Sequence, residues 1–320
     1  NLKQSLETGE RRSLRSRRNK RYVSGKGLYD RYVSDICEST DTVKSLVDKL
    51  ERQNICVTEM VMRTLLADCA LKLLVSSGEI TVDREIFPAY IDGSLTIGVW
   101  SALIDDIIQD KKAALSWANN NKNFMDTNYY YQKGEDVLGL LYMSIRDAGS
   151  RKAAGSYYTP TKVVRTLISD VTGDMGSRIS EGGKRLFDPC CGTGNFLIQL
   201  PDDIELNNIY ACDIDELSVQ LARFNLALGR LSGRGHVNED EAIRTIYEHI
   251  ERRDFISEYR NDSECGGDDK KLLADPGYDI IIGNPPWGYT FDRETRTLLR
   301  KAYRTAAGRG VESSDVFVEC

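Results

Sequence analysis

The stretch that decides the fold is residues 188–196, which read Asp-Pro-Cys-Cys-Gly-Thr-Gly-Asn-Phe. It follows a short apolar pair, and a second apolar run at residues 208–212 comes after it and ends in Asp213. We therefore predict a strand that ends in an acid, a glycine loop, a helix and a second strand. This order is typical of parallel sheets that bind ligands at the carboxyl ends of their strands. Gly192 and Gly194 allow the backbone to turn tightly and to approach a ligand closely.

Strands and helices continue to alternate toward the end of the sequence. A weakly marked third strand is expected to end near Asp254, and a fourth, residues 280–282, leads to Asn284. Such alternation predicts an α/β fold with a doubly wound, Rossmann-like parallel sheet. Four strands are fewer than such sheets usually have, and residues 313–317 look like the start of another helix. We therefore expect the sheet to be incomplete at the end of this sequence.

The helix between the second and third strands has clear end signals. It is predicted over residues 216–228, with Asp215 as its N-cap and Gly229 just past its last turn. Residues 155–160, Gly-Ser-Tyr-Tyr-Thr-Pro, precede another helix, with Thr159 as N-cap and Pro160 as its first residue. The free N–H groups at the start of that helix can hold a carboxylate. Its apolar face is expected to comprise Val163, Val164, Leu167, Ile168 and Val171.

The first 150 residues show the spacing of helices alone, with apolar residues at i, i+3, i+4 and i+7. We predict helices from about 41 to 50, from 58 to 73, from 96 to 110 and from 135 to 147. Residues 115–131 are polar and rich in Asn and Tyr, which predicts a loop with short turns. The sequence thus divides into a basic arm at 1–26, a helical domain at 27–150 and an α/β domain at 151–320.

Charge is distributed unevenly along the chain. The 320 residues carry a net charge of −6, yet residues 1–26 hold nine Lys or Arg against Glu7 and Glu10. A basic arm on an acidic body fits contact with nucleic acid. The alternative is a solvated segment without a partner, since charge runs alone do not identify one.

Eight cysteines and two histidines narrow the possible chemistry. None of the cysteines forms a Cys-x-x-Cys pair, and most lie in apolar stretches, which indicates reduced thiols in a cytoplasmic protein rather than disulfides or a zinc site. His236 and His249 lie in no cluster that could form a metal site or a Ser-His-Asp triad. No apolar run reaches the roughly 18 residues that a membrane span needs.

A second motif, residues 284–287, reads Asn-Pro-Pro-Trp and follows the apolar run at 278–283. It therefore lies at the carboxyl end of a buried strand. Asn284 Oδ1 and the carbonyl of Pro285 can accept hydrogen bonds from an amino group, and Trp287 can stack on a ring. The motif indicates chemistry on a planar amine. The alternative is an ordinary Asx/Pro turn.

The acids that end the first three strands indicate the kind of cofactor. The dinucleotide pattern Gly-x-Gly-x-x-Gly is absent because residue 197 is Leu, so NAD is not expected. Asp188 instead suits a positive ammonium group, and Asp213 can accept hydrogen bonds from ribose hydroxyls. Asp254 and Phe255 offer an acceptor and a ring face for adenine, unless Asp254 is simply an exposed loop acid.

Taken in order, residues 155–160, the glycine loop, Asp213, Asp254 and residues 284–287 resemble the gamma-class N6-adenine DNA methyltransferases of restriction–modification systems. These include the modification subunits of type I systems and the methylase portions of type IIG enzymes. The resemblance covers about residues 135–320 and implies that residues 151–320 form a catalytic domain that binds S-adenosylmethionine. It implies double-stranded DNA as substrate, no metal, and a specificity subunit or fused target-recognition domain outside this sequence.

The resemblance also implies roles for individual residues. Asn284 and Pro285 would hold the N6 amine of a flipped adenine, Trp287 would stack on that base, and the methyl group would move by in-line displacement. The residues implied for catalysis are Asn284, Pro285, Pro286 and Trp287. Those implied for the cofactor are Tyr157, Tyr158, Thr159, Asp188, Cys190, Gly192, Gly194, Phe196, Asp213, Ile214, Asp254 and Phe255.

Other functions stay open at this point. Asn-Pro-Pro also occurs in RNA and protein-glutamine methyltransferases, although residues 155–160 favour DNA. A DNA-binding scaffold subunit that retains the cofactor fold without catalysis is the alternative outside enzymes. A C5-cytosine methyltransferase needs a Pro-Cys nucleophile, but Pro189-Cys190 lies in the loop after the first strand rather than the fourth. We find no convincing nuclease motif before residue 150.

Overall fold

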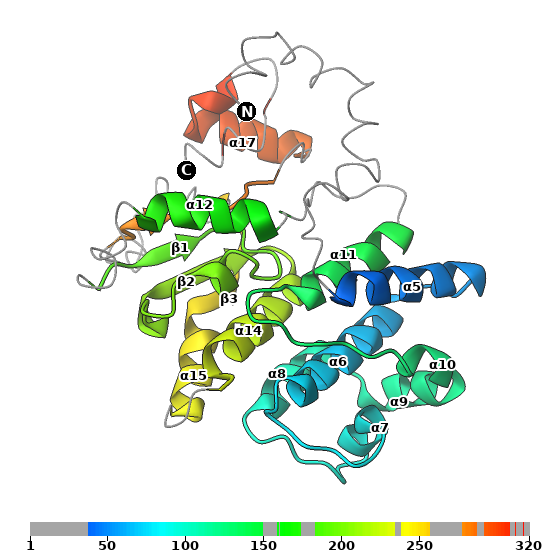
Figure 1. The fold of residues 1–320 in the computed structure, drawn as a ribbon. Helices are drawn as coiled ribbons and strands as arrows, with labels where there is room; N and C mark the ends of the chain where they lie inside the picture. The colour runs from blue at the N-terminus through cyan, green and yellow to red at the C-terminus, as the bar shows by residue number, and fades with distance from the viewer. Residues whose placement is uncertain are drawn as a thin grey trace, which may run out of the picture.

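The computed structural model describes residues 38–149, 159, 161–173, 183–233, 238–256, 277–286, 291–307, 311 and 316 (Figure 1). The basic arm at residues 1–26 lies outside these ranges, and so do Tyr157, Tyr158, Pro160 and Trp287. What the sequence predicts for these residues therefore stays a prediction.

The sheet is parallel, with the strand order β3-β2-β1-β4. Its strands are β1 (Leu186–Asp188), β2 (Ile209–Asp213), β3 (Ile250–Arg252) and β4 (Ile280–Ile281). β1 lies between β2 and β4, and all three of its residues are buried. Because the strands are parallel, their carboxyl ends meet at one edge, where the acids and Asn284 follow them. The predicted α/β sheet is confirmed.

Two helices cover the sheet beside β2 and β3 (Figure 1). They are α14 (Glu216–Leu231) and α15 (Glu239–His249). The Asp215 carboxylate accepts a hydrogen bond from the N–H of Ser218 at 3.2 Å, which confirms the predicted N-cap of α14. α12 (Thr161–Gly173) buries Val164 and Ile168 and packs against the short turn η1 (Leu197–Gln199).

The helices before residue 150 share one hydrophobic core with the sheet, a cluster that runs from Val43 to Ile250. α6 (Glu59–Ser76) lies at its centre and packs against α8 (Trp100–Ile108), α9 (Lys111–Asn120) and α11 (Val137–Gly149). α11 also packs against α5 (Glu38–Arg52), and both α8 and α11 touch α14. The division into domains at residue 150 stays a prediction.

Several predicted helix boundaries were wrong. The helix predicted over 96–110 spans only Trp100–Ile108. The region 115–131, predicted as a loop, begins inside α9 and contains α10 (Lys122–Met125), and α7 (Ile86–Ile91) was not predicted. α9 forms because Asp110 caps its first turn, accepting from the N–H of Ala113 at 2.9 Å. Its inner face, with Ala114 and Ala118, is buried. Tertiary packing therefore holds its Asn-rich end in a helix.

Three predictions near the glycine loop were also wrong. Gly229 lies inside α14, and the positive φ of +71° falls on Gly233 instead. The helix expected after the loop is only the short turn η1. Pro201 disfavours a helical conformation of the residue before it, and Leu200 is accordingly extended, with ψ of 140°, so the helix ends there. Leu167 is 43% exposed, so it does not belong to the buried face of α12.

The last described elements form a second, smaller cluster apart from the main core. α17 (Arg293–Ala302) and the turn η3 (Thr305–Ala307) bury Leu299, Tyr303 and Ala306 together with Phe291 and Ile256. Among the described residues, none of the helices is long and apolar enough to cross a membrane.

Candidate active site

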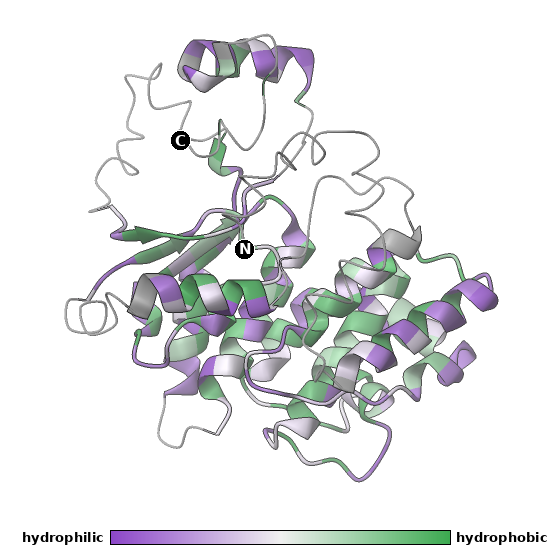
Figure 2. Cartoon of the chain, turned by 45° about the horizontal axis from the view of Figure 1, so that its top comes forward, coloured by the Kyte–Doolittle hydropathy of each residue, from purple (hydrophilic) through white to green (hydrophobic). Residues whose placement is uncertain are grey.

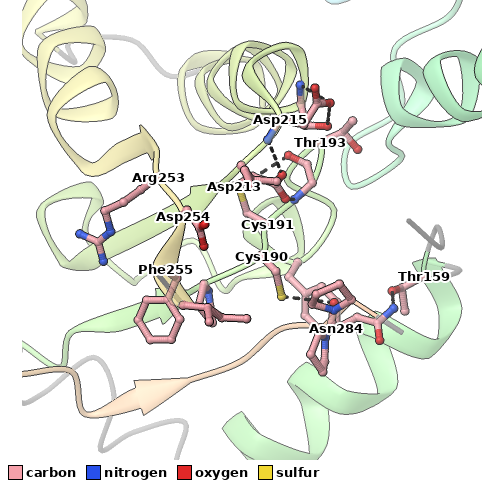
Figure 3. Close-up of a pocket in the computed structure, with 18 of the residues that line it drawn as sticks. Thr159, Cys190, Cys191, Thr193, Asp213, Asp215, Arg253, Asp254, Phe255 and Asn284 are labelled. Atoms are coloured by element: carbon pink, nitrogen blue, oxygen red, sulfur yellow. Dashed lines mark hydrogen bonds between the residues drawn. The ribbon is translucent and has the colours of Figure 1, made fainter. Parts of the chain in front are cut away.

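A cavity of about 470 Å³ lies at the carboxyl ends of the strands (Figure 3). The segments that follow all four strands line it. The predicted site residues among its lining are Thr159, Cys190, Gly192, Phe196, Asp213, Ile214, Asp254, Phe255, Asn284, Pro285 and Pro286. Asp188 and Gly194 do not line the cavity. The structure thus brings together segments that lie more than 120 residues apart in the sequence, from Thr159 to Asn284.

The glycine loop wraps from β1 toward α14. Gly192 has φ of +53° and donates its N–H to Asp213 Oδ2 at 2.9 Å. Gly194 has φ of +88°, and a Cβ at this position would lie 3.1 Å from the Cα of Ala222 on α14. Gly192 therefore shapes the cavity wall, whereas Gly194 permits close packing of the loop on α14.

Asp213 is held in one orientation at the end of β2. Its Oδ1 accepts from the N–H of Asp215 at 2.9 Å, while its Oδ2 accepts from Gly192. Burial raises the pKa of the Asp213 carboxyl, and the two backbone donors counteract part of that shift. Each carboxylate oxygen can accept more than one hydrogen bond, so Asp213 can still bind a hydroxyl group in the cavity.

Asp188 is fully buried at the end of β1, next to the cavity-lining Cys190. Its Oδ1 accepts from the N–H of Cys190 at 3.1 Å, whereas its Oδ2 has no hydrogen-bond partner in the part of the chain that the structure describes. Burial raises the pKa of this carboxyl to about 8, and the charge of Asp213 adds to the shift. A nearby cation would lower the pKa of this buried carboxyl again and so stabilise its charged form.

Gly283 was not among the predicted site residues, yet it lets the fourth strand approach the first. A Cβ at this position would lie 2.5 Å from Asp188 Oδ1 and 3.3 Å from Cys190 Sγ. No other residue type fits there without displacing the acid. A glycine directly before Asn284 was the sequence signal for this close approach.

Asn284 is anchored on two sides. Its Nδ2 donates to Thr159 Oγ1 at 3.1 Å, and its backbone carbonyl accepts from the thiol of Cys190 at 3.2 Å (Figure 3). Thr159 is in turn tied to the glycine loop, because Asn195 Nδ2 donates to its carbonyl at 2.6 Å. Thr159, the glycine loop and the Asn-Pro-Pro motif are therefore connected in one site.

An apolar part of the cavity lies between the ends of β2 and β3. Ile214 is 59% exposed and Phe255 lines the same cavity, where its ring packs 5.4 Å from that of Phe187. Asp254 precedes Phe255 and also lines the cavity. An exposed isoleucine beside a supported aromatic ring and a carboxylate can bind a flat heterocycle that has an amino group.

One wall of the cavity comes from α11, which sequence reasoning had assigned only to the helical region. Tyr142, Met143 and Arg146 line this wall. Tyr142 donates its hydroxyl hydrogen to Asp215 Oδ2 at 2.6 Å, and Arg146 Nη1 donates to the Tyr142 hydroxyl at 3.2 Å. Tyr142 and Arg146 at i and i+4 on an otherwise apolar helix were the available signal.

Asp136 was also missed by the sequence reasoning, and it supports the glycine loop on the side away from the cavity. It is buried and accepts from the N–H of Gly139 at 2.7 Å, from Thr193 Oγ1 at 2.5 Å and from Asn225 Nδ2 at 2.7 Å. Asn225 Nδ2 also donates to the Thr193 carbonyl at 2.9 Å. Burial raises the pKa of Asp136 to about 6 despite these donors. Asp136 thus joins the start of α11 to the glycine loop and to α14.

The chain belongs to the N-6 DNA methylase family, because the family model of that description matches residues 133–313. The expected kinship with gamma-class N6-adenine methyltransferases of restriction–modification systems is thereby confirmed. In the part of the chain that the structure describes, no group of three or more His, Cys, Asp or Glu could hold a metal ion.

Individual proteins are similar to parts of the chain. It is 27% identical over 238 residues to the type II methyltransferase M.VspI of Vibrio sp. (strain 343), a match that covers 74% of this chain and 50% of the relative. It is 26% identical over 156 residues to the type I restriction enzyme EcoEI methylase subunit of Escherichia coli, covering 48% and 28%. The chain therefore spans about half the length of the first relative and 28% of the length of the second.

Among solved structures, the cryo-EM structure of the DrdV–DNA complex is similar over 91% of this chain and 33% of that one, with a TM-score of 0.47 and 15% identity.

Proposed function

We propose that the protein transfers a methyl group from S-adenosylmethionine to the N6 amine of adenine in double-stranded DNA. Family membership supports the reaction class. The observation that carries the proposal is the anchored Asn284, which shares one cavity with the acids and the aromatic ring that follow β2 and β3.

The residues around the cavity fit S-adenosylmethionine. Asp188, with an oxygen that has no partner among the described residues, would balance the charge of the ammonium group. Asp213 would accept hydrogen bonds from the ribose hydroxyls. Ile214 and Phe255 would contact the faces of the adenine ring and Asp254 its amino group. When bound, the cofactor supplies an electrophilic methyl group on its sulfonium.

The Asn-Pro-Pro motif would prepare the target amine. The N6 lone pair of adenine is delocalised into its ring, which makes the amine a poor nucleophile. Asn284 Oδ1 and the Pro285 carbonyl would accept the two N–H hydrogens and so localise the lone pair on nitrogen. The hydrogen bond from Asn284 Nδ2 to Thr159 fixes the plane of this amide. Catalysis would then rest on positioning, which needs no covalent nucleophile.

The target base must leave the duplex to reach this cavity. Unpairing and unstacking cost a few kcal/mol, roughly 2–4. Stacking on Trp287 would offset about 1–3 kcal/mol of that cost.

The thiol of Cys190 has a supporting role in this proposal. It donates to the carbonyl of Asn284, and burial raises the pKa of the thiol well above its ordinary value. A protonated thiol that is held as a hydrogen-bond donor does not act as the nucleophile that a C5-cytosine methyltransferase requires.

Replacement of the amide tests the proposal. We expect Asn284→Ala to lower kcat for methylation of a duplex by about 100-fold or more, as for loss of a group that acts in the transition state. Calorimetry should show unchanged affinity for S-adenosylmethionine. Asn120→Ala is the matched control, because Asn120 is exposed on α9 and its side chain donates to the carbonyl of Ser116 in the same helix.

The same assay distinguishes the alternatives. Wild-type protein is offered duplex DNA, RNA of the same sequence and a glutamine-containing peptide, each with labelled cofactor. Methylation of RNA or peptide in preference to DNA would replace the proposed substrate, and near-full activity of Asn284→Ala would remove the proposed mechanism. Cofactor binding without transfer to any of the three would favour a scaffold role.

We further propose that the DNA sequence is chosen by a specificity subunit or a target-recognition domain. One relative is named as the methylase subunit of a type I restriction enzyme, and the chain covers only 28% of it. Pull-down of the intact protein with a candidate specificity subunit, followed by methylation of cognate and scrambled duplexes, would test this partnership.

A further inference from the structure

α17 presents a basic face beside the cavity. Between residues 293 and 304 the sequence holds five cations and one acid, Glu294. The cations Arg293, Arg296, Arg300, Lys301 and Arg304 are all exposed. An adjoining side of the helix is buried, because Leu299 belongs to the second hydrophobic cluster together with Tyr303, which follows the helix. Figure 2 shows the alternation of hydrophilic and hydrophobic positions along this helix, at the top of the view.

The cations of α17 have no acidic partner among the residues that the structure describes. In the part of the chain that the structure describes, Arg293, Arg300 and Lys301 form no ion pair, and Arg296 donates only to the carbonyl of Asp292 one turn before it. Other cations of this acidic chain do find acids, as Lys72 does with Asp68 at 2.6 Å. The basic face of α17 is therefore available to an anionic partner.

The position of α17 identifies where that partner would lie. Phe291, Asp292 and Thr295, at the start of the helix, line the cavity together with Asn284. Asp292 caps the helix by accepting from the N–H of Thr295 at 2.8 Å, which fixes its first turn at the cavity rim. Arg293, Arg296 and Arg300 lie at i, i+3 and i+7, a stripe about 10 Å long on one side of the helix.

We propose that this face, defined by Arg293, Arg296, Arg300 and Lys301, binds the phosphate backbone of the duplex next to the extruded adenine. The inference rests on the proposed function and adds the surface that the DNA uses. A cavity that receives a base from a duplex must have phosphates at its rim, and guanidinium groups bind phosphate oxygens in a bidentate manner. The four cations outnumber Glu294 and the capping Asp292, which leaves the face with a net positive charge.

The salt dependence of DNA binding by the full chain tests this surface. DNA affinity falls as salt rises, so the slope of the logarithm of the association constant against the logarithm of salt concentration is negative. We expect the double variant Arg293→Gln/Arg300→Gln to make this slope less negative by about 1.8, since each phosphate contact contributes about 0.9. Between about 50 and 200 mM salt, the loss of duplex affinity should then be about twelvefold smaller than for wild type. The matched control is Lys112→Gln/Lys122→Gln, which removes the same charge from exposed positions on α9 and α10.

The outcomes separate this surface from the proposed function. An unchanged slope for Arg293→Gln/Arg300→Gln, or an equal change for the control pair, overturns the surface even if the wild type methylates adenine. A less negative slope for the α17 pair alone supports the surface, and it does so even if the wild type fails to bind S-adenosylmethionine, which would contradict only the proposed function. Failure of the wild type to bind duplex DNA also overturns the surface.

Discussion

The two sides of the cavity are built differently. On the side proposed to bind the cofactor (the cofactor side), β1 is wholly buried between two neighbours. The buried carboxylates of Asp136 and Asp188 and the half-buried carboxylate of Asp213 hold or adjoin the glycine loop. On the side proposed to bind the target base (the base side), β4 is a two-residue strand at the edge of the described sheet, and its Ile281 is 63% exposed. α17 rests on its own small cluster there.

The contrast fits what each side would bind under the proposed function. A preformed set of acids and backbone donors would recognise the small charged cofactor of the proposed function, because preorganisation lowers the free-energy cost of binding. A base that leaves a duplex needs an entrance, and a deep core at that place would close it. The hydrogen bonds of Asn284 with Thr159 and Cys190 join the base side to the cofactor side.

The largest effect is expected from a methyl group behind the glycine loop. In Gly139→Ala the new Cβ would overlap with Asp136 Oδ2 and Thr193 Oγ1. The buried carboxylate would lose its donors, and we expect the free energy of unfolding to fall by about 3–5 kcal/mol. Urea denaturation measures this change.

The matched control for that substitution is Gly229→Ala inside α14. Its Cβ would meet only Ile198 Cγ2, at 3.9 Å. Removing a glycine from a helix interior should stabilise the protein by about 0.5–1 kcal/mol. Equal effects of the two alanines would show that the cofactor side is not held by the Asp136 network.

An intermediate effect is expected from pH. The folded pKa of Asp188 is raised to about 8 from an ordinary value of 3.8, so the folded protein without cofactor keeps a proton that the unfolded chain releases. The free energy of unfolding should therefore fall as pH rises from about 4 to about 8. Asp188→Asn should flatten this fall, as urea denaturation over a pH series would show.

Asp292, on the base side, provides a control because its pKa is shifted in the direction opposite to that of Asp188. Hydrogen bonds from Thr295 lower the pKa of its exposed carboxyl, so its contribution to stability is present above the unfolded pKa and lost as pH falls through the lowered value. Asp292→Asn should therefore leave the fall between pH 4 and 8 in place. Identical pH profiles for wild type and Asp188→Asn would contradict the buried, protonated state of Asp188.

The smallest effect is expected at the thiol that joins the two sides. Cys190→Ala removes the donor to the Asn284 carbonyl, and the loss of one such hydrogen bond, about 0.5–1 kcal/mol, should lower kcat two- to fivefold. Cys190→Ser should restore most of the rate, and Cys56→Ala, at an exposed position, should change nothing. A loss of activity in the serine variant as complete as in Asn284→Ala would show that the thiol has a chemical role.

Much of the fold and part of the candidate site could be predicted from the sequence. Apolar runs that end in Asp188 and Asp213 identify strands because a parallel strand is buried on both faces. The run that ends in Asn284 is also a strand, but Ile281 is 63% exposed, so the prediction that this strand is buried was wrong. The N-cap at Asp215 could be predicted because a cap depends on residues within one turn. The ends of the helices in the Asn-rich region could not be predicted, since packing against helices distant in the sequence determines where they begin and end.

The sequence by itself determined which groups end the strands, because local hydrophobicity and turn chemistry are encoded over a few residues. Tertiary structure alone decided that Asp136 supports the glycine loop from 57 residues away, and that α11 forms a wall of the cavity. It also decided that Gly283 must lack a side chain beside Asp188. These features depend on the close approach of segments that are distant in sequence, and no local pattern of residues specifies such distances.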